Sequence, residues 1–235
     1  MADSEIHSIV LGLGHRARSG KDTVAAMIKL ERGKSPLVFN GYDIRIYSFA
    51  AELKREVNEN AMRSGGMIRL FDAGLYHEDG GYLQENGNIL KLPEWVQYDL
   101  QPDMTDPMCP YGKQRLLLQW WGTEYRRSVN PDYWVNKVAA RIAEEKPAVA
   151  LLTDVRFINE VQFCQKYGNV VKVERPSLPA LQGAAGVHAS ELALANFQGW
   201  DDVIVNDSDL ETLRARALFS FDMLMSATPE RPTSV

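Results

Sequence analysis

Cysteine, basic charge and long apolar runs are all scarce in this chain. Its two cysteines, Cys109 and Cys164, are too few and too far apart for a disulfide framework or a zinc site, which indicates a reducing compartment. No apolar run has the length that crosses a bilayer. The first residues, Met-Ala-Asp-Ser-Glu, lack the basic-then-apolar order of a signal peptide. We therefore expect a cytoplasmic protein with no membrane partner.

The charge balance disfavours a nucleic-acid partner. Proteins that bind nucleic acid broadly carry a basic surface, whereas this chain has a net charge of −5. Basic residues nevertheless gather locally, since Arg16, Arg18 and Lys21 lie close together in the sequence. A length of 235 residues suits one domain, spanning 1–235, with a large core. The oligomeric state stays open, a homodimer included.

Short apolar segments alternate with helical patterns along the chain. Several of these segments are nearly continuous, as expected of strands that are covered on both faces. The alternation predicts an α/β fold with a parallel sheet of about five strands and helices on both faces. The predicted strands are His7–Leu13, Ile44–Phe49, Ala148–Thr153, Val170–Glu174 and Asp202–Val205. The predicted helices are Thr23–Glu31, Ala51–Ala61, Arg115–Tyr125, Tyr133–Glu144, Ile158–Lys166 and Asp209–Leu224.

The segment from about residue 64 to 110 breaks this alternation. It is rich in Gly, Asn, Asp and Pro, and Asn86-Gly87 between two short apolar-polar runs predicts a hairpin. We interpret the segment as an insertion, which either covers the substrate or is a decoration. The tail from about residue 227 has the composition of a disordered segment.

The stretch Gly14–Thr23 is typical of a phosphate-binding loop between a strand and a helix. Glycines let the backbone curl so that N–H groups point inward, the helix N-terminus adds positive charge, and Lys21 reaches the outer phosphates. Two features depart from the usual pattern. Five residues instead of four separate Gly14 from Gly20, and Asp22 replaces the usual Ser or Thr. The alternative is an ordinary strand–helix turn.

Asp154 lies at the end of the third predicted strand. In phosphate-loop enzymes a strand of this kind delivers an acid beside the loop, where the acid binds or orients magnesium. Arg156 follows at the carboxyl edge of the sheet, where ligands bind in open α/β folds. The alternative is that Asp154 caps the next helix and that Arg156 is a surface residue. We favour the magnesium role, because the acid falls where the loop requires it.

Charged residues between positions 113 and 127 form a second cluster. Arg115 and Gln119 share one helical face, and Glu124 and Arg127 form a similar pair if the helix continues. Such a face offers two cations, an amide and a carboxylate, which can grip a phosphate and read a base edge.

Two further features each allow a functional and a structural interpretation. Trp120 and Trp121 either stack on a base or lie in the core, and we expect core for at least one of them. Lys54 belongs to a helix whose charges either face a substrate or form a salt-bridged surface.

The segment 175–191 follows a predicted strand, contains Pro and Gly, and re-enters a helix near its end. This placement suits a lid that closes over the phosphates. Arg175 would supply the charge of such a lid, because no other Arg or Lys occurs between Lys172 and Arg214. We expect His188 to position a loop or the substrate rather than to act as a base.

Five short motifs follow one another along the chain. They are Ser19-Gly-Lys-Asp-Thr23, Ser48-Phe-Ala50 with Leu53-Lys54, Gly122-Thr-Glu124 with Arg127, Asp154-Val-Arg-Phe157 with Asn159-Glu160, and His188-Ala-Ser-Glu191. In this order they resemble the bacteriophage deoxynucleoside monophosphate kinases, a branch of the P-loop nucleotide kinases. The resemblance implies a three-layer P-loop fold, with transfer of the γ-phosphate of ATP, assisted by Mg²⁺, to a deoxynucleoside 5′-monophosphate in the host cytoplasm. Asp22 also fits this family.

The resemblance implies roles for individual residues. Catalysis would depend on positioning and electrostatics by Lys21, Asp154, Arg175 and Arg127. ATP would be bound by Gly14, Arg16, Arg18, Ser19, Gly20, Lys21, Asp22 and Thr23, and magnesium by Asp22, Thr23 and Asp154. The acceptor would be bound by Phe49, Lys54, Arg115, Gln119, Trp120, Glu124, Arg127, Arg156, Glu160, His188 and Glu191.

Three alternatives change the acceptor or the class of protein. Phage kinases that phosphorylate a hydroxymethylated pyrimidine within DNA have a similar loop, but they need a groove for a polymer, which the acidic balance disfavours. A second alternative is a kinase that phosphorylates another small acceptor, such as dephospho-coenzyme A. A non-catalytic nucleotide switch would need no second phosphate site, so the Arg-rich cluster at 113–127 disfavours it.

Overall fold

The computed structural model describes residues 6–34, 41–63, 82–85, 88–97, 114–179 and 192–227. They belong to two compact units, one formed by residues 1–49 and 135–235 and the other by residues 50–134. No helix within the described ranges is both long enough and apolar enough to span a bilayer. The predicted tail and most of the predicted insertion lie outside the described residues.

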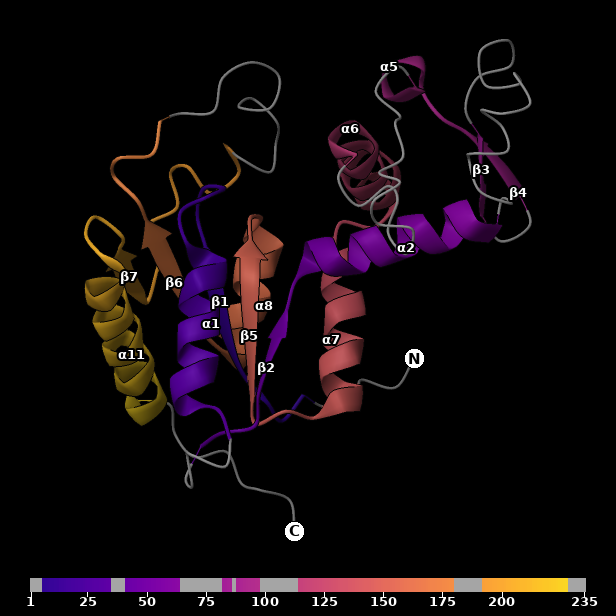
Figure 1. The fold of residues 1–235 in the computed structure, drawn as a ribbon. Coiled ribbons are helices and arrows are strands. Elements are labelled where there is room, and N and C mark those ends of the chain that lie inside the picture. The colour runs from indigo at the N-terminus through magenta and orange to yellow at the C-terminus, as the bar shows by residue number, and fades with distance from the viewer. Residues whose placement is uncertain are drawn as a thin grey trace. The chain divides into compact units, whose positions relative to one another are not determined.

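The first unit is built on a five-stranded parallel sheet with the strand order β2-β5-β1-β6-β7 (Figure 1). Its central strand β1 lies between β5 and β6. Strands β1 and β5 are almost entirely buried, which explains their continuous apolar sequences, whereas β6 is buried at Val170, Val171 and Val173. The strands are β1 (Ile9–Gly14), β2 (Ile44–Tyr47), β5 (Val149–Val155), β6 (Gly168–Glu174) and β7 (Asp202–Val205). The predicted sheet is confirmed.

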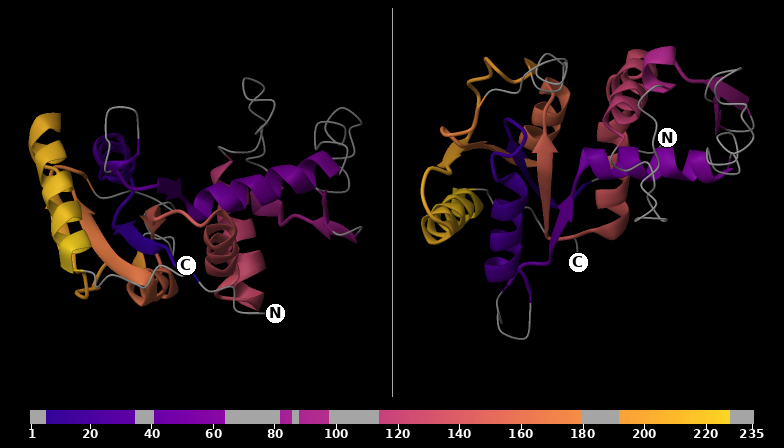
Figure 2. Two further views of the ribbon diagram at one scale, coloured as in Figure 1. Left: turned by 90° about the horizontal axis from the view of Figure 1, so that it is seen from below. Right: turned by 45° about the horizontal axis from the view of Figure 1, so that its top comes forward.

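Helices cover both faces of this sheet, as predicted. Helix α1 (Lys21–Arg32) packs on β1, β2 and β5, and helix α11 (Leu210–Ala227) packs beside it on β7. Helix α8 (Ile158–Tyr167) covers the opposite face, against β1 and β6, and the view from below shows the sheet between α1 and α8 (Figure 2). The predicted three-layer α/β fold is therefore confirmed.

The alternation of side chains along β1 explains this layering. Leu11 and Leu13 belong to the core under α1 and α11, whereas Gly12 faces α8. A Cβ atom at Gly12 would lie 2.5 Å from Cys164 Sγ, so the close approach of α8 requires glycine. Cys164 is fully buried, and burial raises the pKa of its thiol.

Helix α7 (Tyr133–Glu145) ends in the first unit at an ion network with β2. Glu145 accepts hydrogen bonds from Arg45 (3.0 Å), Tyr47 (2.9 Å) and Arg141 (2.7 Å). These donors, chiefly Arg141 and Arg45, lower the pKa of Glu145 to about 2.

The second unit contains most of helix α2 (Phe49–Arg63), the hairpin β3 (Tyr82–Glu85) and β4 (Asn88–Lys91), and the short helix α5 (Glu94–Gln97). The two hairpin strands pair antiparallel, which confirms the hairpin predicted around Asn86-Gly87.

The helix predicted over 115–125 is only partly an α-helix. Helix α6 (Arg115–Gln119) continues as a π-helix, η1 (Trp120–Arg127). Trp134 Nε1 donates a hydrogen bond to the carbonyl of Gly122 at 3.0 Å, and a side-chain donor at a helix carbonyl widens the turn. Glu124 and Arg127 therefore lie on a π-helix and not on the continuing α-helix that the prediction assumed.

A buried carboxylate joins three helices within this unit. Glu56 Oε1 accepts from Trp121 Nε1 (2.9 Å) and Arg126 Nε (2.6 Å), and its Oε2 accepts from the Tyr133 hydroxyl (2.8 Å). The Arg126 guanidinium also lies 4.9 Å from the Tyr125 ring centroid. Trp121 is fully buried and Trp120 is only 9% exposed, so both members of the tryptophan pair lie in the core, where at least one was expected.

Candidate phosphate-binding site

The loop between β1 and α1 is held open by a left-handed glycine. Gly20, which precedes α1, has φ of +107°, a conformation that costs other residues energy. A Cβ atom there would lie 2.7 Å from Asn206 Nδ2, which itself donates to the carbonyl of Ser19 at 2.9 Å. Both the backbone and the neighbour therefore require glycine at this position.

Lys21 lies inside the curl of this loop. Its side chain is only 6% exposed. Its ammonium donates to the carbonyls of Arg16 (2.6 Å) and His15 (3.1 Å) and to Ser19 Oγ (3.4 Å). The ammonium brings a positive charge into the loop, which favours the binding of an anion there.

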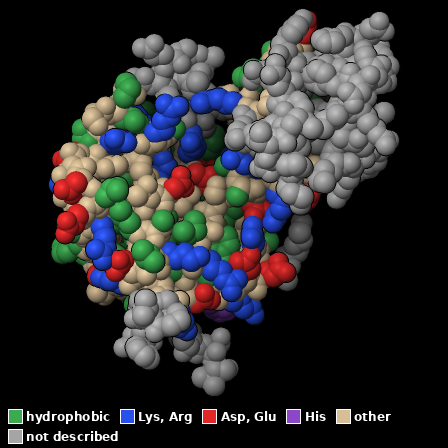
Figure 3. Space-filling view, viewed as in Figure 1, with side chains coloured by type: hydrophobic (Ala, Val, Ile, Leu, Met, Phe, Trp, Pro, Cys, Tyr) green, Lys and Arg blue, Asp and Glu red, His purple; other side chains and the backbone are tan. Residues whose placement is uncertain are grey.

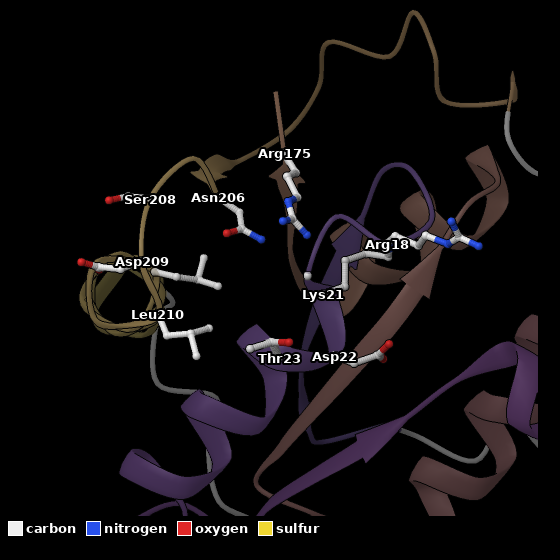
Figure 4. A pocket seen from close by; sticks show the side chains of 11 residues that line it. Arg18, Lys21, Asp22, Thr23, Arg175, Asn206, Ser208, Asp209 and Leu210 are labelled. Atoms are coloured by element: carbon white, nitrogen blue, oxygen red, sulfur yellow. The ribbon is translucent and has the colours of Figure 1, made fainter. Parts of the chain in front are cut away.

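A cavity of about 490 Å³ opens over the N-terminus of α1, a volume within the range of small-molecule sites. Arg175, which follows β6, points into it from above, whereas the Arg18 guanidinium points away from Arg175 (Figure 4). Lys and Arg side chains gather at this end of the visible face (Figure 3). The lining residues are Arg18, Gly20, Lys21, Asp22, Thr23, Arg175, Asn206, Ser208, Asp209, Leu210 and Leu213.

Two helices begin at this cavity, and they differ in how their N-termini are satisfied. Asp209 Oδ1 accepts from the backbone N–H of Thr212 at 2.8 Å and so caps α11, and this bond lowers the pKa of Asp209. The N-terminus of α1 follows Gly20, which provides no capping side chain. The positive end of α1 is therefore left for a ligand.

Asp154, near the end of β5, accepts hydrogen bonds from the two residues at the start of α2. Its Oδ2 accepts from Ser48 Oγ (2.8 Å) and its Oδ1 from the backbone N–H of Phe49 (2.9 Å), the first residue of α2. Asp154 thus caps α2, not α8 as the alternative interpretation supposed. Magnesium prefers one or two protein carboxylates and otherwise takes water and phosphate oxygens.

Glu160 and Arg156 lie at the start of α8. Glu160 is buried, and its Oε2 accepts from the backbone N–H groups of Arg156 (2.7 Å) and Phe157 (3.1 Å). The carboxylate thus closes the first turn of α8. The Arg156 side chain is half-buried.

The residues predicted to bind the acceptor are mostly in the second unit, with Phe49 buried in the first. Trp120 stacks on Tyr125, with ring centroids 5.4 Å apart and planes 13° apart. Arg127 Nη1 donates to the carbonyl of Pro131 at 3.3 Å. Lys54, Arg115 and Glu124 are exposed, and Gln119 and Arg127 are half-buried. His188 and Glu191 lie outside the described residues.

Sequence reasoning missed the wall of the cavity formed by residues 206–213. Asp209 was predicted only as the first residue of a helix, although the segment follows the carboxyl end of a parallel strand, where ligands bind. That position was the signal that could have found Asn206 and Ser208. Conversely, the cavity brings Arg175 together with Lys21 and Thr23, which belong to a different segment of the sequence.

The side chains near the loop suit magnesium, which takes few protein ligands, better than a metal ion that is bound by several protein side chains. Within the described ranges, no group of three His, Cys, Asp or Glu side chains could hold an ion. Asp22 and Thr23 are exposed at the start of α1 and line the cavity. A carboxylate and a hydroxyl fit an ion whose remaining ligands are water and phosphate oxygens.

No protein-family model matches this chain, and no curated protein sequence does. A dephospho-CoA kinase from Campylobacter jejuni is similar in structure at 12% identity, with a TM-score of 0.46 over 92% of this chain and 97% of that one. A shikimate kinase from Acinetobacter baumannii (12% identity, TM-score 0.39, 96% and 97% covered) and a sugar kinase from Janibacter sp. (11%, 0.40, 95% and 99%) are also similar. At these low scores the likeness decides nothing about substrate, and the function has to be inferred from the site.

Proposed function

We propose that this protein transfers the γ-phosphate of ATP to a deoxynucleoside 5′-monophosphate. The observation that carries the proposal is the convergence of Lys21, the open N-terminus of α1 and Arg175 on one cavity. A polyphosphate is the ligand that needs all three, because each of them stabilises negative charge.

The cavity is divided in a way that suits ATP as the donor. Its basic part, with Lys21 and Arg175, would hold the phosphates, and Asp22 and Thr23 would hold Mg²⁺, which neutralises phosphate charge. Leu210, which lies away from Arg175 in the lining (Figure 4), offers an apolar wall for the adenine ring.

In the proposed reaction an oxygen of the acceptor phosphate forms a bond to the γ-phosphorus while the bond to the β–γ bridging oxygen breaks. ADP leaves, and the acceptor becomes a diphosphate. Such transfer needs positioning and charge stabilisation more than a covalent intermediate. Arg175 would neutralise charge as the phosphoryl group moves, and Arg127, Arg115 and Arg156 would hold the acceptor.

The choice of a deoxynucleoside monophosphate rests on the motif resemblance and on the second unit. Its helices carry exposed Arg115 and Glu124 and the half-buried Tyr125, which stacks on the buried Trp120. A cation, a carboxylate and an aromatic ring suit a ligand that has both a phosphate and a base.

An acceptor panel tests the proposal. The enzyme is incubated with MgATP and each natural or hydroxymethylated deoxynucleoside monophosphate, and nucleotides are separated by anion-exchange chromatography. We expect ADP and a deoxynucleoside diphosphate in equal amounts with at least one acceptor. Duplex DNA containing hydroxymethylpyrimidine serves as the competing acceptor. Transfer only to that DNA, or ATP consumption that no acceptor accelerates, would contradict the proposal.

A further inference from the structure

The first position of the phosphate loop is occupied by a histidine. The usual pattern places a glycine five positions before the glycine that precedes the lysine. Counted back from Gly20, that position is His15, and its φ of +97° is the left-handed conformation typical of glycine. The loop therefore has the usual spacing, with histidine in place of its first glycine.

Gly14 is a glycine for a separate reason. It is the last residue of β1, and a Cβ atom there would lie 2.5 Å from two ring atoms of Trp200. Gly14 therefore serves the packing of Trp200, whereas His15 makes the turn into the loop. The apparent extra residue between Gly14 and Gly20 is explained without a longer loop.

A histidine at this backbone position has an energetic cost. A side chain in the left-handed conformation costs about 1–2 kcal/mol, which glycine would avoid. Strained positions of this kind concentrate at functional sites. The imidazole of His15 is therefore a candidate for a role that glycine could not fill.

The His15 ring lies among more positive than negative groups. Its Nδ1 is buried and has no hydrogen-bond partner among the described residues. The ring interacts electrostatically with Lys172 and Glu174 of β6, with Arg16 of the loop and with Lys21 of α1. Burial and then Lys172 are the largest causes that lower the pKa of His15 below its ordinary value of 6.5. The imidazole is therefore neutral at pH 7 in the empty loop.

We propose that His15 binds a proton when a polyphosphate occupies the loop, and that the imidazolium then helps to hold the phosphates. The inference rests on the proposed function, since it needs a polyphosphate at Lys21. The phosphates offset the repulsion from Arg16, Lys21 and Lys172, which favours the charged imidazole. The proton comes from solvent.

The sign of the resulting pH dependence follows from this charge balance. Because the bound state holds the proton more tightly than the empty loop, lowering the pH favours binding. Between pH 8 and pH 6 the affinity for MgATP should rise more in the wild-type protein than in a variant without the imidazole. A rise of one unit in the pKa of His15 on binding corresponds to an affinity gain of up to about tenfold.

Two variants isolate the imidazole without endangering the fold. His15→Gly restores the usual glycine at a left-handed position and removes backbone strain, so it should raise the melting temperature. His15→Asn keeps a polar side chain that tolerates this conformation but does not titrate. His7→Asn, outside the loop, is the matched control.

Calorimetric titration with MgATP and with inorganic tripolyphosphate, each in two buffers of different ionisation enthalpy, measures the protons taken up. We expect the wild-type protein and His7→Asn to take up more protons than either His15 variant. We also expect the dissociation constant of the His15 variants, relative to wild type, to increase as the pH falls from 8 to 6. Equal proton uptake in all four proteins would overturn the role of His15 while leaving the kinase proposal standing. If neither ligand binds at any pH, both proposals are wrong.

Discussion

Single residues in the phosphate loop each satisfy more than one physical requirement. Gly20 is needed for its backbone angle and for the room it leaves to Asn206. Lys21 stays inside the loop because two carbonyls accept from its ammonium. Substitutions here should therefore have effects that can be separated by measuring both stability and nucleotide binding.

Replacing Gly20 with alanine should destabilise the protein by about 2 kcal/mol, which combines the left-handed backbone penalty with the loss of the Asn206 hydrogen bond. For a chain of this size that corresponds to a fall in melting temperature of about 4–8 °C. Differential scanning calorimetry measures it. Asn206→Ala, which loses only the hydrogen bond, should show the smaller fall. An unchanged melting temperature in Gly20→Ala would contradict the steric account.

At the scale of elements, the buried Glu56 fixes α2, η1 and the start of α7 to one another. Removing one member of a buried ion pair leaves the other charge unpaired, which costs about 3 kcal/mol or more. We therefore expect Glu56→Gln to lower the free energy of unfolding by about that amount, measured by urea denaturation with tryptophan fluorescence.

Two comparisons give this prediction its control. Arg214→Gln breaks the more exposed Arg214–Glu31 pair and should cost less than about 1 kcal/mol. The double variant Glu56→Leu with Arg126→Met removes both charges, so it should be less destabilised than the sum of its single variants. Strict additivity would show that the Glu56–Arg126 pair is not coupled.

The elements that the sequence predicted well are those decided by local pattern. Strand β7 was predicted at its observed bounds, and β1 and β5 were predicted within two residues at each end. Apolar runs between polar turns leave little choice of where a strand begins and ends. The π-helix was not predictable, because it depends on the bond from Trp134 to Gly122, a contact between separate elements.

The charged residues of the site could be predicted from the sequence, but other residues that line the cavity could not. Lys21 and Arg175 were identified from loop chemistry and from the scarcity of other cations, and both line the cavity. Asn206 and Ser208 carry no motif of their own, and only the strand order brings them beside Ser19 and Gly20. The backbone angle of His15 could be known only from the structure.

In the molecule as a whole, the parallel sheet, the phosphate loop and the cavity all serve the one proposed chemical step. The parallel sheet brings the carboxyl ends of β1, β6 and β7 together, so residues far apart in sequence surround one phosphate site. If that site holds the donor, loss of the loop lysine should stop transfer while leaving the core of the sheet intact.

The most direct test is the rate of γ-phosphate transfer from MgATP to the best deoxynucleoside monophosphate in the wild-type protein, Lys21→Ala and Lys29→Ala. Lys29 is exposed on the same helix and serves as the control. The account predicts that Lys21→Ala lowers kcat by about 100- to 1,000-fold, with an unchanged circular dichroism spectrum and a near-normal rate in Lys29→Ala. Near-normal transfer by Lys21→Ala would contradict the central claim.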